Sequence, residues 1–215
     1  ECEYRIRISY YGELTNAIKS CKSKYTSATA FGWSPGLLDE WVNLFQGKDV
    51  LDYGCGYGGS SFFISNFAKS VVGVDSAKAC ISHCRKQAID NASGNATFQL
   101  GSDLHLEFRD NSFDCLYSND FIEHLHPADA RLHLAEAFRV IRPGGCYLCY
   151  TPGRSSGPHD ITKAFYPQGF CFPSLGSHLY EYTPFELQEF GISVGFCVCF
   201  PKSKTDILAL FQKSL

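Results

Sequence analysis

A glycine-rich turn that follows a short apolar stretch limits the fold of this chain more than any other feature. Residues 50–59 read VLDYGCGYGG, and residues 60–67 continue with a helical pattern. Glycine accepts positive φ and lets the backbone approach a ligand closely. The start of a helix presents N–H groups that favour an anionic group nearby. The sequence therefore predicts a strand, a tight loop and a helix, with a ligand bound above the loop.

The carboxylate at the end of the predicted strand narrows the class of ligand. Gly54, Gly56 and Gly59 also fit the dinucleotide fingerprint G-x-G-x-x-G, so a nicotinamide-dependent reductase is one interpretation of the loop. Asp52 precedes the loop, where its charge would repel a pyrophosphate but would form a charge-assisted hydrogen bond with an ammonium group. S-adenosyl-L-methionine (SAM) carries an ammonium group, so Asp52 favours SAM over NAD.

Residues 52–56, DYGCG, resemble the first motif of the class I SAM-dependent methyltransferases, and later stretches resemble the same family in the same order. The likeness covers residues 50–215 and is closest to the small-molecule branch, the methyltransferase type 11-like proteins. It implies SAM as the cofactor and an α/β fold, a Rossmann-like doubly wound sheet of seven strands with the last strand antiparallel. The sequence agrees, because the connection between the strands expected at 193–200 and 205–211 is too short for a parallel crossover.

The second predicted strand supplies the next cofactor residue. Asp75 ends the apolar run at 70–75, one helix and one strand after the glycine loop. In folds of this kind, an acid at this place hydrogen-bonds the ribose hydroxyls. A second interpretation makes Asp75 the N-cap of the helix expected at 77–90, although Ser76 could cap that helix itself.

The resemblance assigns further cofactor contacts to the ends of the next two strands, which we expect at 96–100 and 113–118. It places Asp103 and the backbone N–H of Leu104 at the adenine, and Asn119 at the methionine portion of SAM. The complete set of predicted cofactor-binding residues is Asp52, Gly54, Cys55, Gly56, Asp75, Ser76, Asp103, Leu104 and Asn119.

Two helix boundaries are also predicted. An amphipathic pattern at 129–140 is followed by IRPGG at 141–145, which predicts a sharp turn before a strand at 146–150. A later helix is expected to begin at Pro184 and to end near Gly191.

The remaining segments predict how an acceptor would reach the cofactor. Residues 1–49 are expected to form a helical N-terminal cap, and residues 50–215 the SAM-binding methyltransferase domain. Residues 151–182 are long for a strand-to-helix connection and rich in aromatic side chains. Because ligands bind beyond the carboxyl ends of parallel strands, we expect this segment to be an acceptor-binding lid.

The chemistry of methyl transfer selects the catalytic candidates. Transfer from a sulfonium requires alignment of donor and acceptor and the exclusion of water. A hydroxyl or amine acceptor also needs a base, and histidine titrates in the useful range. The candidates are His159, His178 and His124, and His159 is favoured because Asp160 and the predicted lid surround it.

A metal site is an alternative use of the same region. In the small-RNA 2′-O-methyltransferases and the ubiquinone-biosynthesis O-methyltransferases, acids and histidines in comparable stretches hold a divalent cation. The corresponding residues here are Asp120, Glu123, His124 and His178. Asp120 departs from that pattern, because a glutamate is usual at its position. The primary prediction therefore assigns no metal.

The composition of the chain limits the kinds of molecule that it can bind. The chain has 215 residues, a net charge of −3 and 11 cysteines. It carries no basic block that would bind nucleic acid and no run long enough to cross a membrane. Many cysteines without a disulfide pattern are typical of buried thiols in the cytoplasm. Cys146 and Cys149 have C-x-x-C spacing, but on a strand they face opposite ways, which argues against a shared zinc ion.

The predicted function is therefore SAM-dependent methyl transfer to an O or N atom of a small-molecule acceptor. A non-catalytic SAM-binding module of a larger assembly and a metal-assisted RNA 2′-O-methyltransferase are the alternatives. The sequence identifies neither the acceptor nor the oligomeric state.

Overall fold

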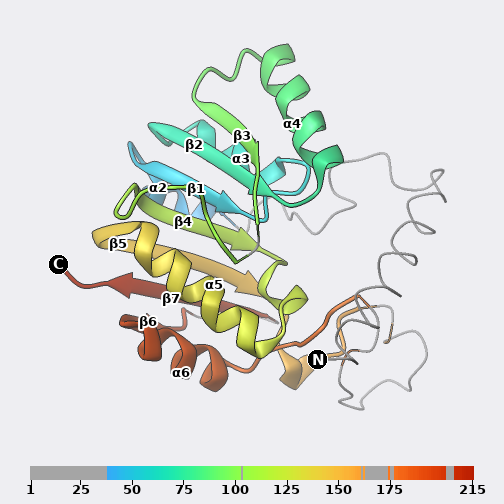
Figure 1. Ribbon diagram of the computed structural model, residues 1–215, viewed down its shortest axis with the longest axis vertical. Coiled ribbons are helices and arrows are strands. Elements are labelled where there is room, and N and C mark those ends of the chain that lie inside the picture. The colour runs from blue at the N-terminus through green and yellow to red at the C-terminus, as the bar shows by residue number, and fades with distance from the viewer. Residues whose placement is uncertain (1–37, 103, 161, 163–173, 175–176, 202–205) are drawn as a thin grey trace.

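The computed structural model of the protein describes residues 38–102, 104–160, 162, 174, 177–201 and 206–215. A seven-stranded sheet lies at its centre, with the strand order β3-β2-β1-β4-β5-β7-β6 (Figure 1). The strands are β1 (Asp49–Tyr53), β2 (Ser70–Asp75), β3 (Ala96–Leu100), β4 (Phe113–Asn119), β5 (Ile141–Thr151), β6 (Phe196–Cys199) and β7 (Ile207–Lys213). The α-helices of the described residues are α2 (Val42–Phe45), α3 (Gly59–Ser65), α4 (Lys78–Asp90), α5 (Pro127–Val140) and α6 (Pro184–Val194).

All strands except β7 run in one direction. β1 pairs in parallel with β2 and β4, and the pairs β2–β3 and β4–β5 are also parallel. β7 is antiparallel to both β5 and β6, because the chain reverses in the short connection between β6 and β7. The predicted α/β class, the seven strands and the antiparallel last strand are confirmed.

Helices cover both faces of the sheet, as a doubly wound fold requires. On one face, Leu134 of α5 and Phe190 of α6 join a core with Leu116 of β4. On the other face, α2 and α3 contribute Phe45 and Ile64 to a second core. Figure 1 shows α5 crossing in front of the strands and α6 beside β6, at the edge of the sheet.

Side-chain alternation along β5 separates the two cysteines of the C-x-x-C motif. Cys149 belongs to the core beneath α5 and α6, whereas Cys146 belongs to the opposite core. The Sγ atom of Cys146 lies 3.6 Å from that of Cys115 on β4. The prediction that Cys146 and Cys149 face opposite ways is confirmed.

The turn predicted at 141–145 is an irregularity within β5 rather than a turn that precedes the strand. These residues begin β5 instead, and the preceding helix α5 starts at Pro127, two residues before the predicted range. Ile141 is fully buried and pairs with Phe113 of β4, where the register of the two strands shifts. Pairing with β4 resumes at Cys146, and Gly144 has φ +77°, so Pro143 and its neighbouring glycines form an irregular stretch within the strand.

The predicted end of α6 near Gly191 is also wrong, because the helix continues to Val194. A Cβ at Gly191 would lie 2.5 Å from Val198 Cγ2, so close packing against β6 is what requires this glycine. Gly195 ends the helix with φ +107°, and its N–H donates to carbonyl groups of the last turn.

Some predicted features lie outside the described residues. Of the expected N-terminal cap at 1–49, only residues 38–49 are described, and they contain a short 3-10 helix (Asp39–Trp41), α2 and the start of β1. Asp103 and most of residues 161–176 of the predicted lid also lie outside. None of the helices within the described ranges has the length and apolar character needed to cross a bilayer.

Candidate functional site

The glycine loop turns over the carboxyl end of β1. Gly54, Gly56 and Gly58 have φ angles of +78°, +51° and +82°, which glycine adopts without strain. The N–H groups of Gly54 and Cys55 both donate to Val74 O, at 2.8 and 2.9 Å. These bonds hold the loop against the end of β2.

Two glycines of the loop are required for different reasons. A Cβ at Gly54 would collide with the ring of Phe121, so this glycine lets the loop pack on the protein. A Cβ at Gly56 would meet no atom within 4 Å. The surface of the loop at Gly56 is therefore open to a ligand that approaches the backbone, as the sequence predicts.

The loop uses its N–H groups within the protein. Gly56 N donates to Asp75 Oδ2 at 2.8 Å, and Gly58 N donates to Cys55 O at 2.8 Å. The helix that follows, α3, is short. The expected attraction of an anion to the helix start therefore has little support, whereas close approach to the loop surface is supported.

Asp75 joins the loop to the start of α4. Its second carboxylate oxygen, Oδ1, accepts from Ala77 N at 2.7 Å. Ala77 is the N-cap of α4 and no side chain caps this helix, so the alternative that made Asp75 the N-cap is wrong. A carboxylate has about four lone-pair sites, so both oxygens retain capacity to accept from hydroxyl groups. Asp75 can therefore hold the loop and the chain before α4 and still accept from a ligand.

Asp52 is enclosed beneath the loop. Its exposed fraction is 2%, and Ser61 Oγ of α3 donates to Asp52 Oδ2 at 2.5 Å. Burial raises the pKa of Asp52 to about 7, against the opposing effect of the Ser61 hydrogen bond. An ammonium group beside Asp52 would stabilise the ionised carboxylate, whereas an anion would not. The residues of this loop thus fit the cationic amino acid portion of SAM.

Two of the remaining cofactor candidates flank the loop. Cys55 is buried, and its hydrogen bond with Cys84, together with burial, raises the pKa of its thiol. Ser76 is an exposed residue directly after β2.

The candidates for contacts with the adenine and methionine portions of SAM are Asp103, Leu104 and Asn119, and the structure describes only the last two. Leu104 N donates to Ser102 Oγ at 3.2 Å. Asn119 ends β4, and its Nδ2 donates to Asp120 Oδ2 at 3.0 Å. Asp103 lies outside the described residues, so its predicted adenine contact has no structural description.

A second polar cluster centres on Glu181, whose side chain is 1% exposed. Its Oε1 accepts from Ser174 Oγ at 2.5 Å, from His178 Nδ1 at 2.8 Å and from His159 N at 2.8 Å. Its Oε2 lies 3.2 Å from His159 Nδ1. Burial acts to raise the pKa of Glu181, but the hydrogen bonds from His178, Ser174 and His159 outweigh it and lower that pKa to about 2. One carboxylate thus brings together two of the three catalytic candidates.

The third candidate, His124, lies against His178. Their rings are 5.2 Å apart and nearly perpendicular, at 82°. The backbone secures this contact, because Leu179 N and Tyr180 N both donate to Glu123 O, at 2.9 and 3.0 Å.

Three of the four residues of the predicted metal set come together in the structure. One ligand atom from each of Glu123, His124 and His178 lies within 4.8 Å of the others, and Asp120 is not part of that group. Asp120 has φ +49° and is half-buried. Burial and the charge of Glu123 raise the pKa of Asp120 to about 7.

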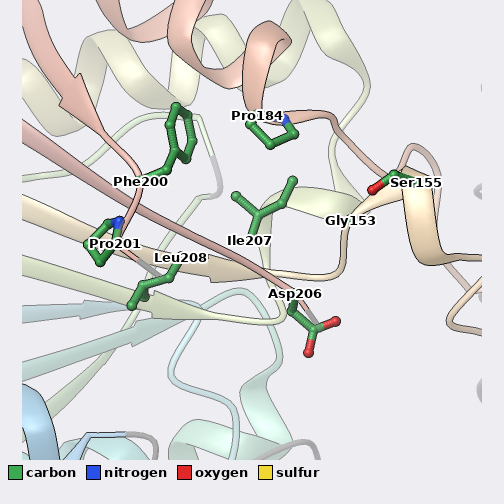
Figure 2. Close-up of a pocket in the computed structure, with 8 residues that line it drawn as sticks. All are labelled: Gly153, Ser155, Pro184, Phe200, Pro201, Asp206, Ile207 and Leu208. Atoms are coloured by element: carbon green, nitrogen blue, oxygen red, sulfur yellow. The ribbon is translucent and has the colours of Figure 1, made fainter. Parts of the chain in front are cut away.

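An open pocket of about 220 Å³ lies between β5, the start of α6 and β7. Figure 2 shows Ile207 directed toward Pro184, with Asp206 at the edge of the pocket. The lining residues are Gly153, Ser155, Pro184, Phe200, Pro201, Asp206, Ile207 and Leu208.

Asp206 links this pocket to the Glu181 cluster. Asp206 Oδ1 lies 3.8 Å from His159 Nε2, and Asp206 Oδ2 accepts from Tyr150 OH at 2.5 Å. His159 therefore lies between two carboxylates, Glu181 and Asp206. Sequence reasoning missed both acids. Glu181 carries only the weak signal of following His178 by three residues, and Asp206 reaches His159 only through the pairing of β7 with β5.

Known proteins resemble this chain over the same region. The methyltransferase domain family matches residues 50–145, which include Asp52, the glycine loop and Asp75. A probable S-adenosylmethionine-dependent methyltransferase of Mycolicibacterium smegmatis is 32% identical over 173 residues, 72% of this chain and 63% of that protein. Phosphoethanolamine N-methyltransferase 1 of Arabidopsis thaliana is 37% identical over 110 residues, 51% of this chain and 22% of that protein. The sterol 24-C-methyltransferase erg6 of Schizosaccharomyces pombe is 34% identical over 134 residues, 60% of this chain and 35% of that protein.

Solved structures share the fold. The YcgJ protein of Bacillus subtilis has a TM-score of 0.65 at 17% identity, over 83% of this chain and 98% of its own. A SAM-dependent methyltransferase from Methanosarcina mazei has a TM-score of 0.60 at 23% identity, over 82% of this chain and 98% of its own. The chain spans less than two thirds of the length of the three curated relatives named above. The chain carries a methyltransferase domain of the class I SAM-dependent methyltransferase family, whose cofactor is S-adenosyl-L-methionine.

Proposed function

We propose that this chain catalyses transfer of the methyl group of SAM to an O or N atom of a small-molecule acceptor. The observation that carries this proposal is the imidazole of His159, which is held by the buried carboxylate of Glu181 and lies beside Asp206, a partner of Tyr150 on β5. An imidazole supported in this way is suited to accept a proton from a hydroxyl or amine.

The proposed cofactor site lies at the adjacent strand ends. Asp52 would pair with the ammonium group of SAM, Asp75 would accept from the ribose hydroxyls, and the open surface at Gly56 would admit the cofactor beside the backbone. SAM supplies a methyl group activated by its sulfonium charge. The protein then has to orient the acceptor, exclude water and take up the proton that the acceptor loses.

We assign that proton to His159. Glu181 fixes the orientation of the ring through Nδ1. Asp206, at the edge of the open pocket, lies 3.8 Å from Nε2 on the other side of the ring. Residues 151–182 retain their proposed role as a lid over the acceptor.

Two relatives support a small-molecule acceptor by their names. One is a phosphoethanolamine N-methyltransferase and the other a sterol 24-C-methyltransferase. Their acceptors differ in charge and in the methylated atom, so the names support the size class of the acceptor rather than its identity. The eight cysteines of the described residues are all free thiols, in agreement with the proposed cytoplasmic location.

Activity with labelled SAM tests the proposed function. The full chain is incubated with methyl-labelled SAM and pools of small amines, phenols, phosphorylated amino alcohols and sterols, with RNA as a separate arm. We expect transfer to a small molecule, a loss of about 100-fold or more in kcat in H159Q, and no change in SAM affinity. H105Q is the control, because His105 is largely exposed and pairs with Glu136 rather than with Glu181 or Asp206. Transfer to RNA alone, SAM binding without transfer, or full activity of H159Q would contradict the proposal.

Gly56→Ala is expected to lower SAM affinity by about tenfold or more, because its methyl group would stand where the cofactor approaches the loop. Gly47→Ala is the matched control: Gly47 has φ +66° and its added Cβ would also meet no atom within 4 Å. Both substitutions carry a strain of about 1–2 kcal/mol from the positive φ. Calorimetric titration of both variants with SAM separates strain from obstruction, and equal affinity of the two variants would exclude a cofactor contact at Gly56.

SAM affinity is expected to depend on pH through Asp52. The ordinary pKa of this carboxyl is 3.8 and burial raises it to about 7, so binding of an ammonium group below pH 7 must first remove a proton. Affinity should therefore rise about tenfold per pH unit up to about 7, and fall above about 8 as the α-amino group of SAM loses its own proton. Titrations across this range check the profile, and a pH-independent affinity would show that Asp52 does not face the cofactor's amino group.

A further inference from the structure

We propose that Glu123, His124 and His178 form a binding site for a first-row divalent metal cation, such as Zn²⁺ or Mn²⁺. One ligand atom from each residue lies within 4.8 Å of the others, and among the residues that the structure describes no other group of three or more such side chains meets this condition. The site adjoins the Glu181 cluster and shares His178 with it, but it does not use His159, so it does not depend on which acceptor the enzyme takes.

Glu123 provides the strongest indication of a missing partner. Its side chain is fully buried, and its Oε1 atom has no hydrogen-bond partner, whereas Oε2 accepts from Thr151 Oγ1 at 2.9 Å. A buried carboxylate oxygen without a partner costs free energy, because it loses its hydration and gains nothing in return. Glu123 Oε1 lies 4.0 Å from His124 Nε2, so the oxygen without a partner faces an imidazole nitrogen.

Both imidazoles are oriented as metal ligands usually are. His178 Nδ1 is 2.8 Å from Glu181 Oε1, and His124 Nδ1 is 3.0 Å from Ser177 O. An acceptor at Nδ1 favours the tautomer with the proton on that nitrogen and the lone pair on Nε2. A carboxylate or backbone carbonyl behind a histidine is the usual second layer of a metal site, which fixes the ring and raises its basicity.

The ligand types select the class of cation. Two imidazole nitrogens and one carboxylate oxygen suit Zn²⁺, Mn²⁺, Fe²⁺ or Co²⁺, whereas Mg²⁺ and Ca²⁺ prefer oxygen ligands only. Metal–ligand bonds of about 2.0–2.2 Å would draw the three atoms closer together than they lie here. Three protein ligands leave coordination positions for water or an acceptor oxygen, as in catalytic rather than structural metal sites.

Metal binding by the full, untagged chain tests this proposal. The protein is stripped with a chelator, dialysed against Mn²⁺, Zn²⁺ or Co²⁺, and its metal content is measured together with the visible absorption of the Co²⁺ form. We expect one equivalent of metal per chain and a loss of affinity of at least about tenfold in H124N and in H178N. His124 is partly exposed, so H124N is expected to fold even if variants of the buried Glu123 do not.

H105N serves as the control and should bind metal as the unaltered chain does, because His105 pairs with Glu136 and is not one of the three proposed ligands. Absence of stoichiometric binding by the folded chain would overturn the proposal. Equal affinity of H124N, H178N and the unaltered chain would do the same, as would a sulfur-to-cobalt charge-transfer band, which would place the metal on cysteines. SAM affinity measured in parallel is expected to be unchanged in both variants, so the metal site and the proposed function can fail separately.

Discussion

Replacement of Asp52 by asparagine is expected to weaken SAM binding by about 100-fold or more, while the free energy of unfolding stays the same or increases. Asparagine keeps the size of the side chain and can still accept from Ser61 Oγ, but it cannot pair with an ammonium group as a carboxylate does. A loss of 100-fold corresponds to about 2.7 kcal/mol, which is within the range of a charge-assisted hydrogen bond at a buried site.

The stability of the same variant separates binding from folding. Because burial raises the pKa of Asp52 from 3.8 to about 7, its contribution to stability is present below the unfolded pKa and is lost as the pH rises through the folded one. Asparagine removes this pH dependence and should not destabilise the protein at neutral pH. Titration calorimetry with SAM and urea unfolding measure the two effects, with D90N, at an exposed residue of α4, as the control. Unchanged affinity of D52N would show that the loop was assigned to the wrong ligand.

Replacement of Glu181 by alanine is expected to lower the free energy of unfolding by about 3–5 kcal/mol, the usual cost of removing one member of a buried charged network. His159, His178 and Ser174 would lose their shared acceptor. E181Q should recover part of the loss, because an amide oxygen can still accept some of these hydrogen bonds.

Urea unfolding of E181A, E181Q and the unaltered chain measures this effect. E107A is the matched control, because Glu107 is an exposed acid whose removal should change the unfolding free energy by no more than about 0.5 kcal/mol. If the free energy of unfolding of E181A equals that of E107A, the Glu181 cluster does not stabilise the fold.

The parts of the fold that were predicted correctly are those with local signals. Local sequence restricts the backbone in the glycine loop, in the strand that ends at Asp75 and in the short β6–β7 connection. The start of β5 and the end of α6 were predicted wrongly, because they depend on partners distant in the sequence. Gly191 resembles a helix stop but is needed where α6 packs on Val198.

The same division holds for the candidate site. Asp52 could be found because it adjoins the glycine loop, and the histidines because few residue types titrate near neutral pH. Glu181 could not be assigned, since its role arises only when His159, Ser174 and His178 meet around it. The unpaired oxygen of Glu123 is likewise a property of packing, and no sequence pattern reports it.

A crystal structure of the full chain with SAM or S-adenosylhomocysteine tests the central claim most directly. The amino nitrogen of the bound cofactor is expected within hydrogen-bond distance of an Asp52 carboxylate oxygen, and the ribose hydroxyls at Asp75, with the cofactor in contact with the backbone at Gly56. A cofactor bound elsewhere, or one whose amino group lies away from Asp52, would contradict this account.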